Sequence, residues 1–273
     1  MSPEACGLRL VLKQTSHLFA QTPSLTPQAS SQIPMITLPL QHDVQSRATP
    51  TERSMQIAVM FGLSLDGTQT HTIIPPIELT LAPGTIVFVT GVSGGGKSTL
   101  LRLIHQGIDE LADTNQPTPA VVCSDHLTDM PGEALVDALA MPEGQLDAAP
   151  SPATLEQVCH WLSLAGLNDA AVMLRKPDQL SEGQRHRLKL AQAMAVAQRR
   201  PEPWSVLLID EFGSTLDRTT AFALARSLRR WVVKSNVCLV CATTHDDLLE
   251  PLAPDVLVEV GPGGKCDVHR RIL

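Results

Sequence analysis

Short apolar runs alternate with helical patterns along most of the chain after residue 73. Strands that are buried on both faces have this length and composition. The runs are Thr85–Thr90, Ala120–Cys123, Ser205–Ile209 and Val237–Ala242. Strands that alternate with helices are typical of a parallel sheet with crossover helices. The pattern therefore predicts an α/β fold built on a parallel sheet.

Patterns at the edges of this region predict antiparallel structure. Ile77–Leu81 alternates apolar and polar residues like a half-buried strand, so we expect a smaller antiparallel β part near residues 70–90. The stretch 256–269 has a glycine-rich turn in its middle and predicts a terminal hairpin. Glu52–Phe61 has helical spacing, with Thr51 as its cap and Gly62 as its end, and predicts a helix.

The first 50 residues have a different composition from the rest. They are rich in Ser, Thr, Gln and Pro, and they show no sustained period. A segment such as Gln21–Ser31 cannot bury enough apolar surface to offset its ordering entropy. We therefore expect residues 1–50 to form a mostly disordered N-terminal segment, with a short strand around Met35–Leu40. The folded domain is expected to span residues 51–273.

Composition limits the classes of protein to which the chain can belong. The chain has 21 basic and 28 acidic residues, a formal net charge of −7, so no whole-chain charge favours nucleic acid. Its longest apolar stretches are too short to span a bilayer, and its first residues do not have the pattern of a signal peptide. We expect a soluble, cytoplasmic protein that reaches a membrane only through a separate subunit.

The six cysteines are too few for a disulfide framework in 273 residues. Cys238 and Cys241 form a CxxC within a predicted strand, where residues three apart point to opposite faces. We therefore interpret both as packing residues. No spacing of His, Cys or acidic residues along the sequence indicates a zinc or iron site.

A phosphate-binding (Walker A) loop lies between a predicted strand and a predicted helix. Gly91–Ser98 matches G-x-x-x-x-G-K-[ST] at every fixed position. In this motif backbone N–H groups converge on phosphate oxygens, the Lys97 ammonium reaches the β- and γ-phosphates, and the Ser98 hydroxyl ligates Mg²⁺. The residues expected around the nucleotide are Gly91, Ser93, Gly94, Gly95, Gly96, Lys97, Ser98 and Thr99.

Two adjacent carboxylates follow the predicted strand Ser205–Ile209. A strand tip beside the phosphate loop would place Asp210 on the Mg²⁺ ion and leave Glu211 to orient or deprotonate a water. Because the pair accompanies the glycine loop, we interpret it as functional rather than as a solvated strand end. Glu211 predicts hydrolysis of the nucleotide.

Three further motifs resemble those of the ATP-binding cassette (ABC) ATPases. Leu180–Arg187 contains LSEGQ, which matches four of the five positions of the family signature LSGGQ. Ser214–Asp217 resembles the D-loop, and Thr243–Asp246 resembles the segment with the switch histidine. The resemblance implies that Ser181, Gly183 and Gln184 contact ATP on another protomer. It also implies that Asp217 joins the two nucleotide sites and that His245 contacts the γ-phosphate.

The resemblance covers roughly residues 51–273 and implies a P-loop NTPase core with a small antiparallel β part and a helical signature subdomain. The helical insertion is expected at about residues 106–180. The family further implies a head-to-tail homodimer that holds two Mg-ATP molecules. Stretches around Asp210–Arg218 and Ala242–Leu248 look like a soluble branch of the family that is fused to acetyltransferase-like domains.

The sequence departs from the family at two positions. The family has a Gln after the strand that follows the phosphate loop, whereas here Ala120–Cys123 runs into Ser124-Asp125-His126. Asp125 is either a substitute oxygen ligand or an ordinary loop acid. The family also stacks an aromatic ring on adenine. Phe61 is the one aromatic residue between Phe19 and Phe88, and we favour core packing for it.

Basic and aromatic residues elsewhere receive structural interpretations. Arg185, Arg187 and Lys189 are read as the solvated face of the signature helix rather than as a nucleic-acid interface. The pair Arg229-Arg230 is read as surface charge beside a buried Trp231, and His160-Trp161 is placed in the core.

Three functions remain open at this point. The first is a soluble ATPase whose dimer closure drives a change in a protein or nucleic-acid partner. The second is the nucleotide-binding subunit of a transporter whose membrane subunits are separate chains. The third is a nucleotide switch that does not hydrolyse ATP, which the presence of Glu211 and His245 disfavours.

Overall fold

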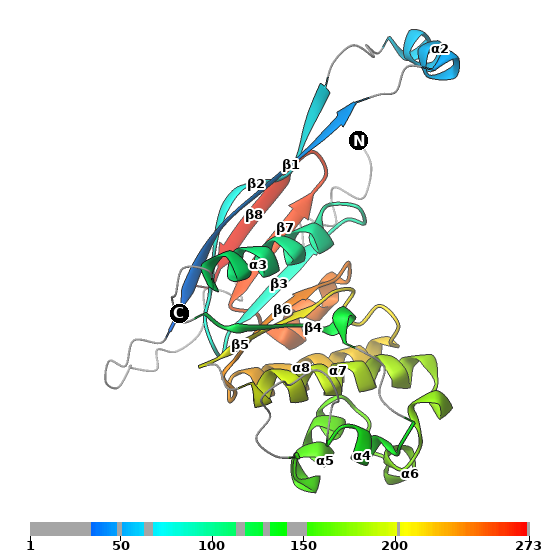
Figure 1. The fold of residues 1–273 in the computed structure, drawn as a ribbon, viewed down its shortest axis with the longest axis vertical. Coiled ribbons are helices and arrows are strands. Elements are labelled where there is room, and N and C mark those ends of the chain that lie inside the picture. The colour runs from blue at the N-terminus through cyan, green and yellow to red at the C-terminus, as the bar shows by residue number, and fades with distance from the viewer. Residues whose placement is uncertain are drawn as a thin grey trace.

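A computed structural model describes residues 34–47, 51–62, 68–112, 118–127, 132–140, 152–200 and 203–271. Its centre is a six-stranded sheet in the order β4-β5-β6-β3-β7-β8 (Figure 1). Every neighbouring pair is parallel except β7 and β8, which form the expected terminal hairpin. The strands are β3 (Ile86–Gly91), β4 (Ala120–Cys123), β5 (Ser205–Ile209), β6 (Val237–Ala242), β7 (Val256–Gly261) and β8 (Lys265–Arg270). The predicted α/β class is confirmed.

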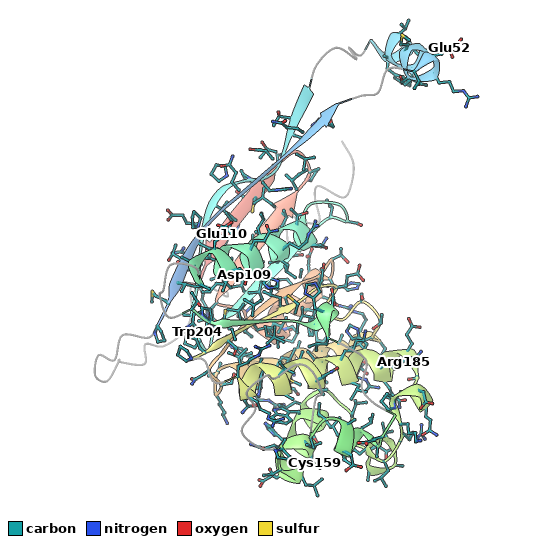
Figure 2. All side chains as sticks on the ribbon, in the orientation of Figure 1. Glu52, Asp109, Glu110, Cys159, Arg185 and Trp204 are labelled. Atoms are coloured by element: carbon teal, nitrogen blue, oxygen red, sulfur yellow. The ribbon has the colours of Figure 1, made fainter. Side chains whose placement is uncertain are left out.

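A second, two-stranded antiparallel sheet joins β1 (Ile36–Arg47) to β2 (Thr68–Leu81). The helix α2 (Glu52–Phe61) lies between them in sequence, with Thr51 as N-cap and Gly62 as left-handed C-cap, as expected. In Figure 1 this ribbon extends beyond the main sheet, and in Figure 2 Glu52 on α2 lies at the end of the molecule opposite Cys159. We call β1, α2 and β2 together the arm.

The arm corrects two expectations. The strand expected around Met35–Leu40 is present, but it is longer than expected. A disordered segment over residues 1–50 is wrong as far as Arg47, because Ile36–Arg47 pairs with β2 from Ile36↔Leu81 to Arg47↔Thr68. Residues 1–33 lie outside the described part of the chain. The antiparallel part therefore uses residues 36–47 and 68–81 rather than 70–90. Local composition could not reveal the partner strand, because the pairing joins segments about 20 residues apart or more.

The central strands are buried on both faces. Along β3, Ile86 and Phe88 join one apolar cluster, and Val87 and Val89 join another on the opposite face. The same alternation divides β6, where Cys241 belongs to the first cluster and Cys238 to the second. Both cysteines are fully buried. Their interpretation as packing residues on opposite faces is confirmed.

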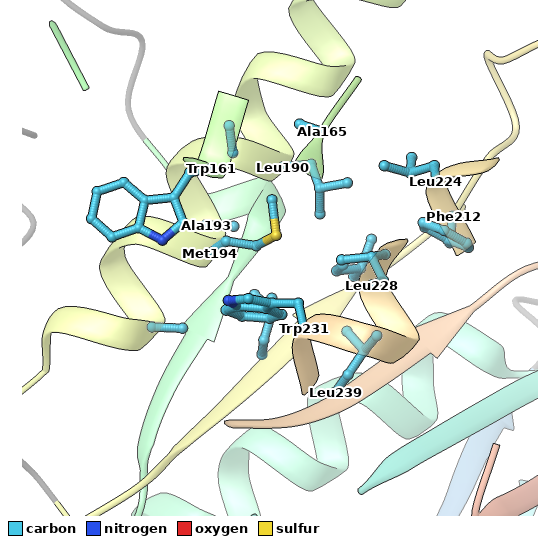
Figure 3. Packing of buried hydrophobic residues seen from close by; sticks show 14 of the residues in the cluster. Trp161, Ala165, Leu190, Ala193, Met194, Phe212, Leu224, Leu228, Trp231 and Leu239 are labelled. Carbon is cyan, nitrogen blue, oxygen red and sulfur yellow. The ribbon is translucent and has the colours of Figure 1, made fainter. Parts of the chain in front are cut away.

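Helices cover the two faces unequally. The helix α3 (Lys97–Ala112) lies on the face that also contacts β1, whereas α7 (Glu182–Arg199) and α8 (Arg218–Val232) cover the other face (Figure 1). On the face covered by α7 and α8, Trp161 and Trp231 lie on either side of Met194 (Figure 3). Both indole N–H groups donate to Oε1 of Gln198, at 2.8 and 3.3 Å. Trp161 is therefore a core residue, as expected, whereas core placement is wrong for His160, which is exposed.

The helical region starts later than expected. The helix α3 continues to Ala112. The strand β4 and a 3₁₀ turn, η1 (Ser124–His126), come next in the chain, and the helical region begins only after them. A start near residue 106 is therefore wrong, because that position lies within α3. The other helices among the described residues are α4 (Leu135–Ala138), α5 (Leu155–Leu164), α6 (Ala170–Met173), η2 (Pro177–Gln179), η3 (Asp246–Leu248) and α9 (Leu249–Leu252). Within the described ranges, none of the helices has the length and apolar character needed to cross a bilayer.

Candidate functional site

The phosphate loop connects the carboxyl end of β3 to the first residue of α3, Lys97. Gly91 has φ +142°, and a Cβ there would lie 1.9 Å from the carbonyl oxygen of Val260 on β7. Gly96 has φ +104°, and a Cβ there would lie 2.9 Å from Cγ2 of Ile73 on β2. Both positions require glycine, since a side chain would collide with a neighbouring strand. The loop is thus held between the main sheet and the arm.

Lys97 folds back over this loop. Its ammonium donates hydrogen bonds of 2.9 Å to the carbonyl oxygens of Gly91 and Val92. Partial burial lowers the pKa of Lys97, and the negative charges of Asp210, Asp246 and Glu211 oppose this shift. The ammonium therefore faces three carboxylates from two other segments, a set that suits a site for a metal–phosphate complex.

Asp210 and Glu211 follow the carboxyl end of β5, as the sequence predicts. The N–H of Glu211 donates to Oδ1 of Asp210 at 2.9 Å. Glu211 has φ +49°, a left-handed conformation that costs a non-glycine residue about 1–2 kcal/mol. The next residue, Phe212, is fully buried, and its N–H donates to Ala242 at 2.8 Å. The burial of Phe212 and its hydrogen bond to Ala242 therefore fix the backbone directly after Glu211.

A cavity of about 590 Å³ joins the phosphate loop to these carboxylates. Its walls come from the arm, the phosphate loop, the start of α3 and the segments after β5 and β6. The lining residues are His42, Val44, Ile73, Ser93, Gly94, Gly96, Lys97, Ser98, Thr99, Arg102, Asp210, Glu211, Ser214, Thr243 and Thr244. Gly91 and Gly95 belong to the same loop without lining the cavity. Carboxyl ends of parallel strands meet at one edge of a sheet, which is where ligands bind in such folds.

Ser98 and Asp210 supply the donors that a magnesium ion requires. A hydroxyl and a carboxylate are hard oxygen ligands, and both side chains line the same cavity. Mg²⁺ binds proteins through one or two carboxylates together with substrate phosphates. The residues at this position therefore fit the ion.

The signature residues lie elsewhere in the chain. Ser181 caps α7: its hydroxyl accepts from Gln184 N–H at 3.3 Å, and Oε1 of Gln184 accepts from Ser181 N–H at 3.0 Å. A Cβ on Gly183 would lie 3.9 Å from Leu216 and Thr215, so the D-loop lies beside the signature. None of Ser181, Gly183 and Gln184 lines the cavity around Lys97. The phosphate loop and the signature residues are therefore at two separate places in one chain.

An ion pair joins the residue after the D-loop to the residue after the switch segment. Asp217 caps α8 by accepting from Thr220 N–H at 2.9 Å, and hydrogen bonding from Thr220 lowers the pKa of its carboxyl. The next residue, Arg218, donates from Nε to Asp247 at 2.9 Å. His245 is half-buried and its N–H donates to Thr243 at 3.2 Å. Thr243 and Thr244 line the cavity, whereas His245 and Asp217 do not.

The structure also brings residues to the site that sequence reasoning missed. His42 and Val44 reach the cavity from β1, and Ile73 reaches it from β2. Asp246 accepts a short hydrogen bond from Thr90 and faces Lys97. The signal for Asp246 was its place next to His245. The arm residues had no local signal, because their role depends on the pairing of β1 with β2.

Four residues outside the motifs have surroundings that bear on their expected roles. Phe61 is 70% exposed on α2, so core packing is wrong for it. Asp125 is exposed on η1 and does not line the cavity. Arg187 donates to the carbonyls of Gly183 and Gly166, at 3.1 and 2.8 Å, and is not a free basic residue. Arg229 forms a partly buried bidentate pair with Asp255 rather than a surface charge.

Comparison with known proteins identifies the class of protein that this fold and site define. The model of the ABC transporter family matches residues 74–212, and the chain belongs to that family. It is 30% identical over 214 residues to the methionine import ATP-binding protein MetN of Sodalis glossinidius, covering 70% of this chain and 58% of that protein. It is also 30% identical over 212 residues to the lipoprotein-releasing system ATP-binding protein LolD of Acinetobacter baylyi, covering 70% and 88%.

Solved structures agree on the fold. A dimeric ATP-binding cassette bound to ADP and Pi superposes with a TM-score of 0.55 at 18% identity, over 76% of this chain and 94% of that one. A bacterial Atm1-family exporter with ATP bound gives a TM-score of 0.53 at 18% identity, over 73% and 36%. The chain is therefore an ABC ATPase domain, homologous to nucleotide-binding subunits of transporters. The finer likeness to a soluble branch stays a prediction.

Proposed function

We propose that this chain binds Mg-ATP and hydrolyses it to ADP and phosphate. The observation that supports this most directly is the single cavity that Lys97, Ser98, Asp210 and Glu211 share. Ser98 and Asp210 would hold Mg²⁺, which when bound neutralises charge on the phosphate oxygens. Lys97 and the N–H groups of the loop hold the phosphates, since α3 begins there with its positive dipole end.

The same proposal assigns the attacking water to Glu211 and His245. Glu211 lines the same cavity as the phosphate loop, and its carboxylate would accept a proton from a water there. His245 follows Thr243 and Thr244, which also line the cavity, and its ring would orient the same water against the γ-phosphate. The left-handed backbone conformation of Glu211 is the kind of local strain that is common at active sites.

The nucleotide base would pack against the arm. His42, Val44 and Ile73 form the part of the cavity wall that comes from β1 and β2. The imidazole ring of His42 would take the place of the aromatic ring that stacks on adenine in the family. This assignment explains why Phe61 on the exposed helix α2 is not required at the site.

The signature implies that two copies complete each site. Ser181, Gly183, Gln184 and Asp217 lie outside the cavity of their own chain, at the exposed start of α7 and beside it. We propose a head-to-tail homodimer in which the signature of one copy closes on the ATP of the other. Dimeric cassettes among the structural relatives support this arrangement.

A phosphate-release assay on the purified chain tests this function. Hydrolysis that requires Mg²⁺, with ATP-dependent dimerisation on gel filtration, is the expected result. ATP that binds without turnover would favour the non-hydrolysing switch instead. Failure to bind ATP would overturn the proposal.

For the coupled partner we propose the membrane subunits of a transporter, on the cytoplasmic side of a membrane. The names of the relatives, import and lipoprotein-release ATP-binding proteins, favour this partner over a soluble one. Co-purification of the tagged chain with integral membrane proteins is the expected result. Hydrolysis that rises with added DNA or RNA, and no membrane partner, would favour a soluble remodelling ATPase.

A further inference from the structure

A cluster of nitrogen and sulfur ligands lies outside the nucleotide cavity. His105 on α3, Cys123 at the end of β4 and His126 on η1 each offer one ligand atom, and these atoms lie within 4.8 Å of one another. They come from three elements and from positions 18 and 3 residues apart, a spacing that indicates no metal motif in the sequence. None of the three lines the cavity around Lys97.

One distance within this cluster already fits a tetrahedral metal. Nδ1 of His105 lies 3.5 Å from Sγ of Cys123. Ligands at zinc–sulfur and zinc–nitrogen bond lengths of ~2.3 and ~2.1 Å stand about 3.5 Å apart at the tetrahedral angle. The rings of His105 and His126 have centroids 6.0 Å apart and are tilted by 40°. His126 is exposed, so its ring can turn toward the other two ligands without disturbing the core.

A carboxylate lies close to the ring of His105, on the side away from Cys123. Oδ2 of Asp109, one turn further along α3, lies 3.6 Å from Nε2 of His105, the ring nitrogen that does not face Cys123. Figure 2 shows Asp109 on α3. Histidines that bind metal commonly donate their second ring N–H to a carboxylate, which orients the ring and raises the basicity of the ligand nitrogen. Asp109 is placed to do this for His105.

We propose that His105, Cys123 and His126 form a zinc site, with Asp109 as the residue that positions His105 and a water as the fourth ligand. Two imidazoles and one thiolate suit Zn²⁺, whereas Mg²⁺ and Ca²⁺ require oxygen ligands. Binding releases the thiol proton of Cys123 to solvent. The site is therefore chemically distinct from the magnesium position at Ser98 and Asp210.

The location of this site gives it a structural consequence. His105 lies two turns into the helix that starts at Lys97, and Cys123 and His126 flank the segment where the family has its Gln. A zinc ion would join the helix of the phosphate loop to that segment. The inference depends on these side chains alone and does not require that the chain hydrolyse ATP.

Zinc titration of the metal-free, nucleotide-free chain against a chromophoric chelator tests the proposal. We expect one Zn²⁺ per chain, bound at least about 100-fold more weakly by Cys123→Ser and His126→Asn. Asp109→Asn should weaken binding by about 10–100-fold. Cys266→Ser and His160→Asn are matched controls from outside the cluster and should bind as the parent does.

Cobalt substitution supplies a second readout. Co²⁺ at this site should give a sulfur-to-cobalt charge-transfer band that is absent from Cys123→Ser and present in Cys266→Ser. If Cys123→Ser fails to fold, His126→Asn replaces only an exposed side chain and still decides the outcome by its affinity. Equal zinc affinity in His126→Asn and the parent, or no thiolate band, would overturn the proposal. Loss of zinc binding in Asp210→Asn would also overturn it, because the ion would then belong to the nucleotide cavity.

Discussion

The cavity around Lys97 and the N-terminal end of α7 are both suited to bind anions, but they differ in how they are enclosed. The cavity has walls from the arm, the phosphate loop and two strand ends, and it collects a lysine and two carboxylates. The start of α7 offers a capping serine and a glycine at an exposed helix end, with the D-loop beside it. One region is enclosed by a single chain, whereas the other is open and, in the dimer that we propose, is completed by a second copy.

This difference predicts two kinds of variant. Changes in the cavity should affect ATP binding or chemistry in each copy separately. Changes at the start of α7 should leave ATP binding intact and should affect closure and turnover. Four variants test this separation.

Lys97→Ala should reduce ATP hydrolysis by about 100-fold or more. The ammonium is the positive side chain that faces Asp210, Asp246 and Glu211 in the cavity, and removal of one preorganised electrostatic group costs roughly 10²–10³ in rate. Phosphate release at saturating ATP measures the effect. Lys189→Ala, an exposed lysine on α7, is the control. If Lys97→Ala hydrolysed ATP at the normal rate, the cavity around Lys97 would not be the site of hydrolysis.

Glu211→Gln should reduce turnover by roughly 10²–10⁴ and retain ATP binding, as expected for loss of a general base. The amide keeps the shape of the side chain at φ +49° but cannot take a proton from water. ATP should then hold the chain in dimers that gel filtration detects. Glu156→Gln, an exposed glutamate on α5, should behave like the parent. A variant that stays monomeric at high ATP concentration would contradict the closed-dimer arrangement.

Ser181→Ala should lower hydrolysis by about tenfold while ATP still binds, because a hydroxyl–phosphate hydrogen bond of about 1.5 kcal/mol would be lost. The variant also loses a helix cap, which costs about 1 kcal/mol of stability. Thr154→Ala removes an equivalent capping box from α5 and is the matched control. Equal hydrolysis in the two variants, at equal unfolding midpoints in urea, would assign only a structural role to Ser181.

His42→Ala should raise the KM for ATP by up to about tenfold and leave kcat unchanged. Stacking of the base on the imidazole ring would contribute about 0.5–1.5 kcal/mol. Steady-state kinetics measures both constants. His71→Ala, an exposed histidine on β2, provides the comparison. A change in kcat rather than in KM would place His42 in the chemistry instead of the base pocket.

Much of this fold was predictable because its signals are local. The bounds of β4, β5 and β6 match the apolar runs. For β5 and β6 the reason is that strands inside a parallel sheet are apolar on both faces, whereas β4 lies at the edge of the sheet. The helix α2 has its expected cap at Thr51 and its expected end at Gly62. The arm was predictable only in part. A short strand was expected around Met35–Leu40, but the extension of β1 to Arg47 and its pairing with β2 depend on contacts between distant segments.

The sequence by itself determined which residues form the part of the cavity that we propose for phosphate and metal. The spacing of Gly91–Ser98 and the pair Asp210-Glu211 place these groups at strand ends, where a short peptide segment dictates its own geometry. Tertiary structure alone decided that His42 from β1 forms a wall of that cavity. It also decided that His105 and His126 meet Cys123, because α3, β4 and η1 come together only when the sheet is assembled. Contacts between distant segments depend on packing, and no local pattern encodes them.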